Sequence, residues 1–414
     1  MATIRAFRAF RPQVDLVTKV AALPYDVMNT EEAKICVEGN PYSFLHIDKP
    51  EMHVVNPKDT TEVFRFAGDT LKRMIQEDVF VQDEPSLYIY GLTNEFTSQY
   101  GIVCCVSAKE YDEGIIKKHE NTRTDKEQDR INHVTYCNAH TGPIFLAYKG
   151  LDLVTLWMKE YVATQKPLYD FTSEDGVRHE VYKVSHPETI KNITAAFKEA
   201  PALYIADGHH RAAAAAAVAR KHLEENTGCE EAQYFLATIF PKEQLYIMDY
   251  NRVLKDESGL SKAQFFEYLK QKFDVEEVSS EIYKPTLRHT FGMRYEKKWY
   301  KLTLKEVCID ENDPVACLDV ALLQNYVLAP VFHIQDPKND KRIDFIGGIR
   351  GIEELNRRTN EDMDIAFSMY PTSMDELIAV ADAHLLMPPK STWFEPKLRS
   401  GIFIHAIDED GFKK

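Results

Sequence analysis

The stretch ALYIADGHHRAAAAAAVARKHLEEN, residues 202–226, decides how the central part of this chain folds. Its first five residues have the composition of a short buried strand. Its alanine-rich part is dominated by strong helix formers until Asn226 and Gly228 stop the pattern. Between the two parts, Gly208 permits a tight turn and Asp207 is placed to cap the helix. The stretch therefore predicts a strand, a glycine turn and a helix.

The first turn of this predicted helix has the character of an anion site, because unsatisfied N–H groups and the helix dipole favour phosphate there. His209, His210 and Arg211 add donors at the same place, and the alanines 212–217 let a neighbouring element approach closely. The alternatives are a plainly capped helix and a zinc site. Adjacent histidines point about 100° apart on a helix, however, and no third ligand follows at a metal-binding spacing. We therefore favour phosphate binding by 207–211.

A second polar cluster, IIKKHENTRTDKEQDRINH, residues 115–133, follows a strand-like run and leads into a predicted helix. Thr124 and Glu127 have the spacing of a capping box, and the helix beyond them is explained as a solvated face with ion pairs. His119 and Glu120 lie just before this helix, where a carboxylate beside an imidazole is able to act as a tuned base. From spacing alone, a catalytic and a structural role for this pair are equally supported.

A third cluster, MPPKSTWFEPKLRSG, residues 387–401, is a basic loop stiffened by three prolines. A rigid loop with cations and hydroxyl groups suits phosphate, and a surface loop pinned by its aromatic residues is the alternative. Its candidate phosphate ligands are Lys390, Ser391, Thr392, Lys397 and Arg399. The N-terminal LPYDVMNTEEA and NPYSFLHIDKPE place further polar side chains on turns around prolines, where ordinary turn chemistry explains most of them.

Length and composition limit the class of protein. A chain of 414 residues is expected to form more than one lobe, and 44% hydrophobic with 28% charged residues is typical of a folded globular protein. The formal net charge of -15 disfavours binding to nucleic acid, which depends on clustered Lys and Arg. Seven scattered cysteines predict reduced thiols, and no signal peptide or membrane-spanning window is present. We therefore expect a cytoplasmic protein that does not bind a membrane.

The pattern of apolar residues predicts an α+β chain in three parts, residues 1–110, 111–255 and 256–414. The first is mixed, with a helix over 61–78 and strands over 43–47, 86–92 and 101–108. The second carries the two central polar clusters, with a helix over 153–163 and a strand over 179–184. The third begins with a helix over 261–278 and a hairpin over 290–304, and it ends with the basic loop.

Eight motifs, taken in order, resemble a large bacterial and archaeal family filed as domain of unknown function 1015. They are RAFRP, LPYDV, NPYSFLHIDKPE, KHENTRTDKEQDR, ADGHHRAAA, YNRVL, RIDFIGG and MPPKSTWFEPKLRSG. They span essentially the whole chain, and the last is very specific. ADGHHR followed by small residues is also similar to the phosphate-binding box of the ParB and sulfiredoxin superfamily, and closest to its free-serine kinases.

The resemblance implies a ParB/sulfiredoxin-like nucleotide-binding core with additional N-terminal and C-terminal α/β lobes. It also implies that Glu120 matches the base that acts on the serine hydroxyl in those kinases, and that 207–211 matches the segment that holds nucleotide phosphates. Phosphoryl transfer needs positioned substrates, positive charge near the phosphate oxygens and a base at the nucleophile, and it does not need covalent catalysis. The sequence offers a candidate residue for each of these three roles.

We therefore hypothesise a phosphoryl-transfer enzyme, a kinase of free serine or a similar amino acid that uses ATP or ADP with Mg²⁺. The alternatives are a phosphatase or phosphotransferase acting on phosphoserine, and a ParB-like nucleotide-binding regulator without catalysis. The expected partners are a small-molecule substrate and a nucleotide, and the oligomeric state stays open.

The expected roles fall into four groups. The candidate catalytic residues are Glu120, His119, His210 and Arg211. The candidate phosphate ligands are Asp207, Gly208, His209, His210 and Arg211, together with Lys390, Ser391, Thr392, Lys397 and Arg399. The candidate substrate-binding residues are Thr122, Lys126, Arg130, Tyr25 and Asp26. For Mg²⁺, the substrate phosphates are expected to be the main ligands, with Asp207 or Asp129 nearby.

Overall fold

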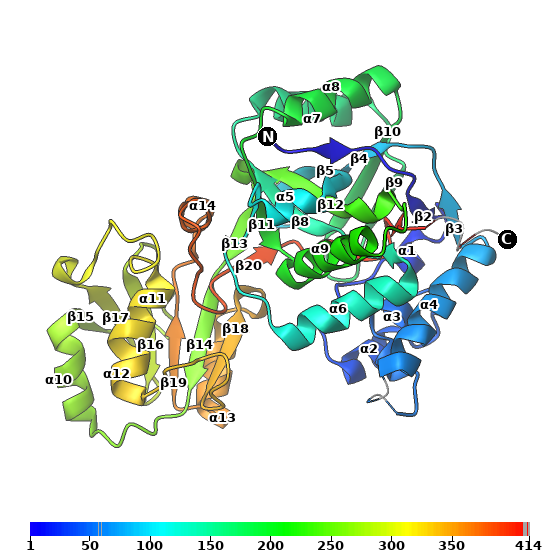
Figure 1. The fold of residues 1–414 in the computed structure, drawn as a ribbon. Coiled ribbons are helices and arrows are strands. Elements are labelled where there is room, and N and C mark those ends of the chain that lie inside the picture. The colour runs from blue at the N-terminus through cyan, green and yellow to red at the C-terminus, as the bar shows by residue number, and fades with distance from the viewer. Residues whose placement is uncertain (57, 59, 409–411, 413–414) are drawn as a thin grey trace. The chain divides into compact units, whose positions relative to one another are not determined.

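The computed structural model describes residues 1–56, 58, 60–408 and 412, and the chain divides into two compact units (Figure 1). Unit 1 comprises Met1–Leu245 and Pro396–Lys414, and unit 2 comprises Tyr246–Glu395. The predicted parts 1–110 and 111–255 contribute strands to one sheet of unit 1, so the division of the structure differs from the one expected at residue 110. Hydrogen bonds between strands that are distant in the chain join these two parts. The pattern of apolar residues within a short window does not predict such pairing.

A mixed sheet of nine strands forms the centre of unit 1 within the described ranges, in the order β6-β11-β8-β12-β5-β4-β10-β9, with β1 paired to β5. The pairs β6/β11 and β8/β12 are parallel, and the remaining pairs are antiparallel. The predicted mixture of helix and sheet is confirmed. The strands are β1 (Ile4–Arg5), β4 (Leu87–Thr93), β5 (Ser98–Ser107), β6 (Ile116–Lys117), β8 (Ile144–Tyr148), β9 (Tyr169–Thr172), β10 (Arg178–Val184), β11 (Leu203–Asp207) and β12 (Tyr234–Pro241).

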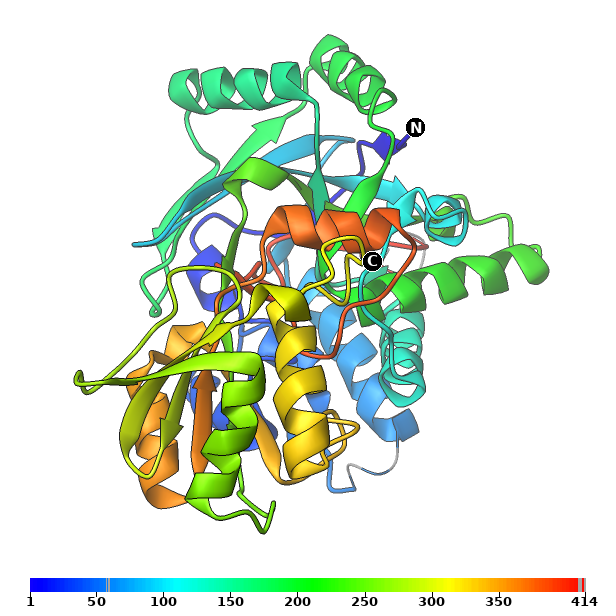
Figure 2. The same cartoon turned by 90° about the vertical axis from the view of Figure 1, so that its left-hand side faces the viewer.

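Helices cover this sheet on both sides. In both ribbon views, α7 and α8 lie on one side of the sheet and α6 and α9 on the other (Figures 1 and 2). Two short ladders complete unit 1, β2 (Phe10–Pro12) with β3 (Phe80–Gln82), and β7 (Ala139–His140) with β21 (His405–Ala406). The helices are α1 (Val17–Val20), α2 (Thr30–Cys36), α3 (Leu45–Asp48), α4 (Thr60–Gln76), α5 (Ala108–Asp112), α6 (Thr124–Cys137), α7 (Asp152–Thr164), α8 (Pro187–Phe197) and α9 (His209–Glu224).

Most of the predicted elements of unit 1 are confirmed, including α4, β4, β5, α7 and β10. The strand predicted over 43–47 is wrong, because this segment contains the short helix α3. The run is enclosed by the turn at Asn40–Ser43 and by Pro50, so it is too short to pair as a strand. Its apolar residues Phe44 and Ile47 are instead fully buried in the core beside α4.

The helix α4 contains Gly68 where it packs against α6. A Cβ added at this glycine would lie 2.3 Å from the carbonyl oxygen of Tyr136, which is main chain and has little freedom to move. We expect Gly68→Ala to lower the free energy of unfolding by about 2 kcal/mol, although alanine favours helix, because overpacking outweighs propensity. Urea denaturation beside the exposed neighbour variant Asp69→Ala measures this; a stabilised Gly68→Ala protein would contradict the close approach.

Unit 2 is built on an antiparallel sheet of six strands within the described ranges, in the order β15-β17-β16-β19-β14-β18. The predicted hairpin is confirmed, with Glu296 and Lys297 at positive φ in its turn. The helix predicted over 261–278 is wrong beyond Lys272, where the chain continues as a strand paired to β17. The partner of this strand lies more than 20 residues further along the chain. The spacing of apolar residues within 261–278 therefore does not reveal the pairing.

The bounds of the elements in unit 2 are as follows. The strands are β13 (Tyr246–Met248), β14 (Tyr250–Leu254), β15 (Phe273–Val278), β16 (Thr290–Tyr295), β17 (Lys298–Leu304), β18 (Ile343–Gly347), β19 (Ile365–Ser368) and β20 (Trp393–Glu395). The helices are α10 (Lys262–Lys272), α11 (Asp319–Leu323), α12 (Ala329–Phe332), α13 (Glu353–Glu361) and α14 (Met374–Asp382), with a π-helical turn at Gln324–Leu328 between α11 and α12.

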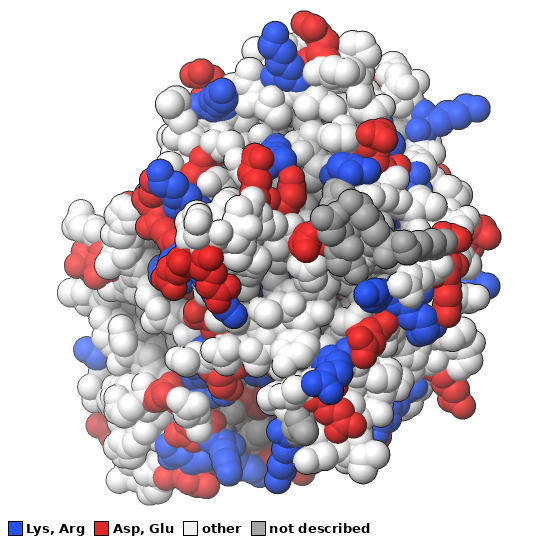
Figure 3. Space-filling model, turned by 45° about the vertical axis from the view of Figure 1, so that its right-hand side comes forward, with Lys and Arg blue, Asp and Glu red and all other residues white. Residues whose placement is uncertain are grey.

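The surface carries charges of both signs. Figure 3 shows Lys and Arg interspersed with Asp and Glu over the face drawn. This mixture accompanies the formal net charge of -15. Throughout the described part of the chain, every helix is too short or too polar to cross a membrane.

Candidate functional site

The predicted strand, glycine turn and helix are present in unit 1. Strand β11 ends at Asp207, Gly208 adopts φ +95°, and α9 begins at His209. A Cβ at Gly208 would lie 3.1 Å from Nε of Arg211, so both the backbone conformation and the space favour glycine. The run Ala212–Ala216 is buried where α9 packs against α6 and the sheet. Small side chains therefore hold the first turn of α9 close to its neighbours.

The N-terminus of α9 differs from the prediction in one respect. Gly208 is the N-cap residue and no side chain caps it, whereas the carboxylate of Asp207 accepts a hydrogen bond from the Gly208 N–H at 2.8 Å. The predicted capping role of Asp207 is therefore wrong, because its side chain binds the N–H of the next residue, Gly208, instead of an N–H group inside the first turn of α9. The N–H groups of the first turn keep their capacity to bind an anion.

A lysine from the C-terminal segment reaches this turn. Nζ of Lys397 lies 3.0 Å from Oδ2 of Asp207, although the two residues are 190 positions apart in the chain. Burial raises the pKa of Asp207, but the charges of Lys397 and Arg211 outweigh this effect and hold the pKa well below its usual range. Asp207 is therefore ionised at neutral pH and fixes the lysine beside the start of α9.

Two hydrogen bonds from main-chain N–H groups to histidine side chains join the segment 119–123 to the same turn. The N–H of His119 donates to Nε2 of His209 at 3.4 Å, and the N–H of Arg123 donates to Nε2 of His210 at 3.1 Å. The His119 and His209 rings also pack edge to face, with centroids 4.4 Å apart. Glu120 lies between these two points of attachment. The two polar clusters identified in the sequence are thus neighbours in the fold.

The histidines here hold the structure as neutral groups. Burial lowers the pKa of His119 to about 4 and holds that of His209 well below its usual range. An imidazole nitrogen that accepts a hydrogen bond is unprotonated, so Nε2 of His210 carries no proton in this arrangement. His119, His209 and His210 therefore attach the segment 119–123 to α9.

This burial makes stability depend on pH. Between about pH 6.5 and pH 4, the unfolded chain protonates His119 while the folded chain does not, so the free energy of unfolding falls as the pH decreases. We expect His119 alone to account for about 3 kcal/mol across this window. Chemical denaturation at several pH values measures the slope, which His119→Gln should reduce; an unchanged slope in this variant would contradict the neutral buried imidazole.

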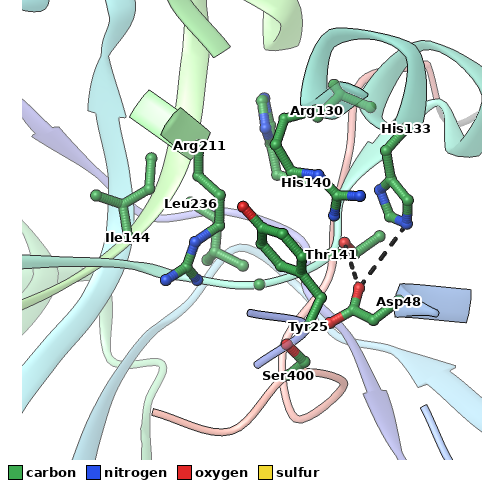
Figure 4. Close-up of a pocket in the computed structure, with 12 residues that line it drawn as sticks. Tyr25, Asp48, Arg130, His133, His140, Thr141, Ile144, Arg211, Leu236 and Ser400 are labelled. Atoms are coloured by element: carbon green, nitrogen blue, oxygen red, sulfur yellow. Dashed lines mark hydrogen bonds and ion pairs between the residues drawn. The ribbon is translucent and has the colours of Figure 1, made fainter. Parts of the chain in front are cut away.

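A small cavity of about 30 Å³ lies next to Arg211, and Figure 4 shows the residues that line it. Its polar lining comes from six separate places in unit 1 and includes Tyr25, Asp48, Arg130, Thr141, Arg211 and Ser400. The guanidinium of Arg130 stacks on the Tyr25 ring at 3.9 Å, and Nη1 of Arg211 donates to the carbonyl of Pro143 at 2.8 Å. Arg211 therefore packs against Gly208 on one side and lines the cavity on the other.

Other predicted substrate-binding residues lie around α6. The hydroxyl of Thr122 donates to Glu127 at 3.0 Å, and Arg123, not Thr124, is the N-cap residue of α6. The predicted capping box of Thr124 and Glu127 is therefore wrong, since Glu127 is bound by the hydroxyl of the residue before the cap. Lys126 and Asp26 are exposed.

The predicted basic loop is divided between the two compact units. Lys397 and Arg399 belong to unit 1, whereas Lys390, Ser391 and Thr392 belong to unit 2. Arg399 donates to the Ser173 hydroxyl at 2.9 Å and forms an ion pair with Asp175. Its partners therefore differ from that of Lys397, which binds Asp207. Within unit 2, Nζ of Lys390 lies over the Tyr250 ring at 5.7 Å, and the Ser391 hydroxyl donates to the Pro388 carbonyl at 2.6 Å.

The two candidate magnesium ligands both have cationic partners. Asp207 binds Lys397 at 3.0 Å, and Asp129 accepts hydrogen bonds from Nε and Nη2 of Arg130 at 2.8 and 2.6 Å. No group of three or more acidic, histidine or cysteine side chains with metal-binding geometry occurs among the residues that the structure describes. These residues do not fit a magnesium site held by protein ligands alone.

The cavity contains functional candidates that sequence reasoning missed. Asp48 and Ser400 stand within two of the quoted motifs, NPYSFLHIDKPE and MPPKSTWFEPKLRSG, but neither was singled out. His133 closes the second polar cluster and Thr141 follows α6, and both are buried beside Asp48. Asp48 and Ser400 share one signal in the sequence, a polar residue inside a quoted motif, whereas Thr141 lies outside the quoted motifs.

Several solved structures are similar to this chain. SbnI with a C-terminal truncation from Staphylococcus aureus is 11% identical, with 74% of this chain and 90% of that chain covered at a TM-score of 0.38. A conserved hypothetical protein from Pyrococcus furiosus is 14% identical, with 74% and 95% covered at a TM-score of 0.34. A free serine kinase in complex with AMP is 14% identical, with 73% and 91% covered at a TM-score of 0.33.

A search of curated proteins gave no match. A family model, in contrast, matches most of the chain, from residue 4 to residue 321. The match includes the segment 119–123, strand β11 and helix α9, which form the site described above. The family is the one described as "Protein of unknown function (DUF1015)", and this chain belongs to it.

Proposed function

We propose that this protein is a phosphoryl-transfer enzyme that uses a nucleotide to phosphorylate the hydroxyl group of a free amino acid such as serine. The observation that carries the proposal is the attachment of the segment 119–123 to the first two residues of α9 by two hydrogen bonds, each from a main-chain N–H to a histidine side chain. The segment that carries Glu120 is thereby attached to a helix N-terminus that no side chain caps. A base next to an anion site is the arrangement that phosphoryl transfer to a hydroxyl requires.

In this proposal, the first turn of α9 and the Gly208 peptide bind the phosphate chain of the nucleotide. Lys397 and Arg211 stand beside that turn and neutralise charge that develops on the transferred group. Glu120 accepts the proton of the acceptor hydroxyl. His119 and His210 are positioning residues, because their contacts fix the segment that carries Glu120.

The proposed nucleotide is ATP or ADP, and the strand, glycine turn and helix are proposed to be part of a ParB/sulfiredoxin-like core. Mg²⁺, when bound with the nucleotide, supplies positive charge to its phosphate oxygens. Because Asp207 and Asp129 are both paired with cations, the ion is expected to be held mainly by those phosphates. The roles assigned to protein residues do not depend on a metal ligand from this chain.

Phosphorus NMR of the full-length protein with L-serine and either ATP or ADP tests the proposal. We expect phosphoserine to form together with the nucleotide that has lost one phosphate. The same protein with phosphoserine and water provides the second arm. Release of inorganic phosphate without transfer from a nucleotide would indicate a phosphatase instead, and nucleotide binding without turnover would indicate a regulator.

A further inference from the structure

The cavity beside Arg211 contains more buried charge than a structural core requires. Arg130 and Asp48 line it and are 7% and 4% exposed, and the hydroxyl-bearing Thr141 and Ser400 are buried as well. Buried charged groups are costly unless they are paired or bind a ligand. The net charge of the two arginines and the acidic groups around them therefore indicates which ligand charge the cavity favours.

Arg130 is only partly neutralised within the protein. Its Nε and Nη2 both donate to one oxygen of Asp129, and its guanidinium stacks on Tyr25. Within the described part of the chain, its Nη1 donates no hydrogen bond to protein. One donor nitrogen of a buried guanidinium thus remains at the cavity, and Figure 4 shows Arg130 and Arg211 on either side of the Tyr25 ring.

Asp48 does not supply the missing charge in full. Burial raises the pKa of its carboxyl group above the usual value, and this effect exceeds the opposing effects of the Ser400 hydroxyl and the two arginines. His133 approaches Asp48 at 3.8 Å, but burial lowers its own pKa to about 3, so the imidazole is neutral. The groups around the cavity favour a ligand with one negative charge.

The size of the cavity limits that ligand. A water molecule needs roughly 10–15 Å³ of comparable volume, so about 30 Å³ accommodates a group of a few atoms and excludes a nucleotide. A carboxylate has this size, carries one charge and matches the donors of a guanidinium. The hydroxyl groups of Thr141 and Ser400 line the same cavity and hydrogen-bond to Asp48.

We propose that this cavity binds the carboxylate group of the acceptor amino acid, with Arg130 and Arg211 as its cationic partners. The inference rests on the proposed function and specifies its substrate class, because it requires an acid and excludes an amino alcohol of the same length. Arg211 then links the two ligands, since it lines the cavity and also packs against the Gly208 turn.

Isothermal titration calorimetry of the full-length protein with L-serine, L-alanine and ethanolamine tests the proposal. L-Alanine has the carboxylate but no hydroxyl group to phosphorylate, and ethanolamine has the hydroxyl but no carboxylate. We expect the two amino acids to bind with similar affinity and ethanolamine to bind at least about 10-fold more weakly, because it leaves Nη1 of the buried Arg130 guanidinium without an acceptor. This readout does not require turnover.

Two variants alter the cavity in different ways. Arg130→Met removes the cation, and Gly142→Ala keeps every charge but places a methyl group 3.2 Å from the Ser400 hydroxyl and 3.3 Å from Nη1 of Arg211. Both should weaken L-alanine binding by about 10- to 100-fold. Arg73→Met, which removes an arginine from an exposed pair with Glu77 on α4, is the matched control and should bind normally.

The outcomes separate this inference from the proposed function. Selective amino acid binding that both variants weaken, in a protein without kinase activity, would support the carboxylate site and reject the kinase. Serine phosphorylation with an unchanged KM in a folded Arg130→Met or Gly142→Ala protein would reject the site and keep the kinase. Equal binding of ethanolamine and the amino acids, or no binding of L-serine and L-alanine, would overturn the inference.

Discussion

Replacing Glu120 by Gln is expected to lower kcat for phosphoryl transfer by about 10²–10⁴-fold, the usual contribution of a general base. The amide cannot accept the hydroxyl proton, although it keeps nearly the same size and can still form hydrogen bonds. Nucleotide affinity should stay within about twofold of the wild-type value, because the phosphates are proposed to bind the first turn of α9. Steady-state kinetics and nucleotide titration of the same preparation measure both quantities.

A matched control for this variant is Glu113→Gln, which removes a carboxylate from an exposed pair with Lys109 at the end of α5. It should leave kcat unchanged. If Glu120→Gln turned over nucleotide and serine at the normal rate, Glu120 would not be the base. A loss of nucleotide affinity equal to the loss of kcat would assign Glu120 to binding rather than to proton transfer.

Replacing Gly208 by Ala is expected to lower nucleotide affinity by about 100-fold and the free energy of unfolding by about 2 kcal/mol. A φ of +95° is unfavourable for a residue with a side chain, at a cost of about 1–3 kcal/mol. The new Cβ would also lie 3.1 Å from the Arg211 guanidinium, so the arginine must move away from the turn. The loss of affinity follows from displaced donors.

The control for Gly208→Ala is Gly150→Ala in the turn before α7. Gly150 has a similar positive φ of +76°, but a Cβ there would meet no atom within 4 Å. It should lower stability through backbone strain and leave nucleotide affinity unchanged. Calorimetric titration and chemical denaturation of both variants separate strain from ligand contact. Normal nucleotide affinity in Gly208→Ala would place the phosphates elsewhere.

The local part of the site follows from the sequence because its determinants are local. A short apolar run, a glycine and an alanine-rich run specify β11, the turn and α9 within about 25 residues, and helix propensity acts on that scale. The hairpin around Glu296 and Lys297 follows in the same way from a turn between two apolar runs. The conformations of the β11–α9 region and of this hairpin thus follow from residues that are close together in the chain.

The rest of the site depends on contacts between distant residues. The cation that reaches Asp207 is Lys397, and nothing in the spacing of the basic loop separates it from Lys390, which belongs to the other unit. Arg399, two residues after Lys397, turns to Asp175 instead. The cavity needs residues from six separate places in the chain, so its existence follows only from the tertiary packing that brings them together.

A crystal structure of the full-length protein with bound ADP tests the central claim most directly. The account predicts phosphate oxygens within about 3 Å of main-chain nitrogens in the first turn of α9 and of Nζ of Lys397, with the Glu120 carboxylate facing the phosphates across a space the size of one amino acid. Phosphates bound at another place, or a Glu120 side chain directed away from them, would contradict it.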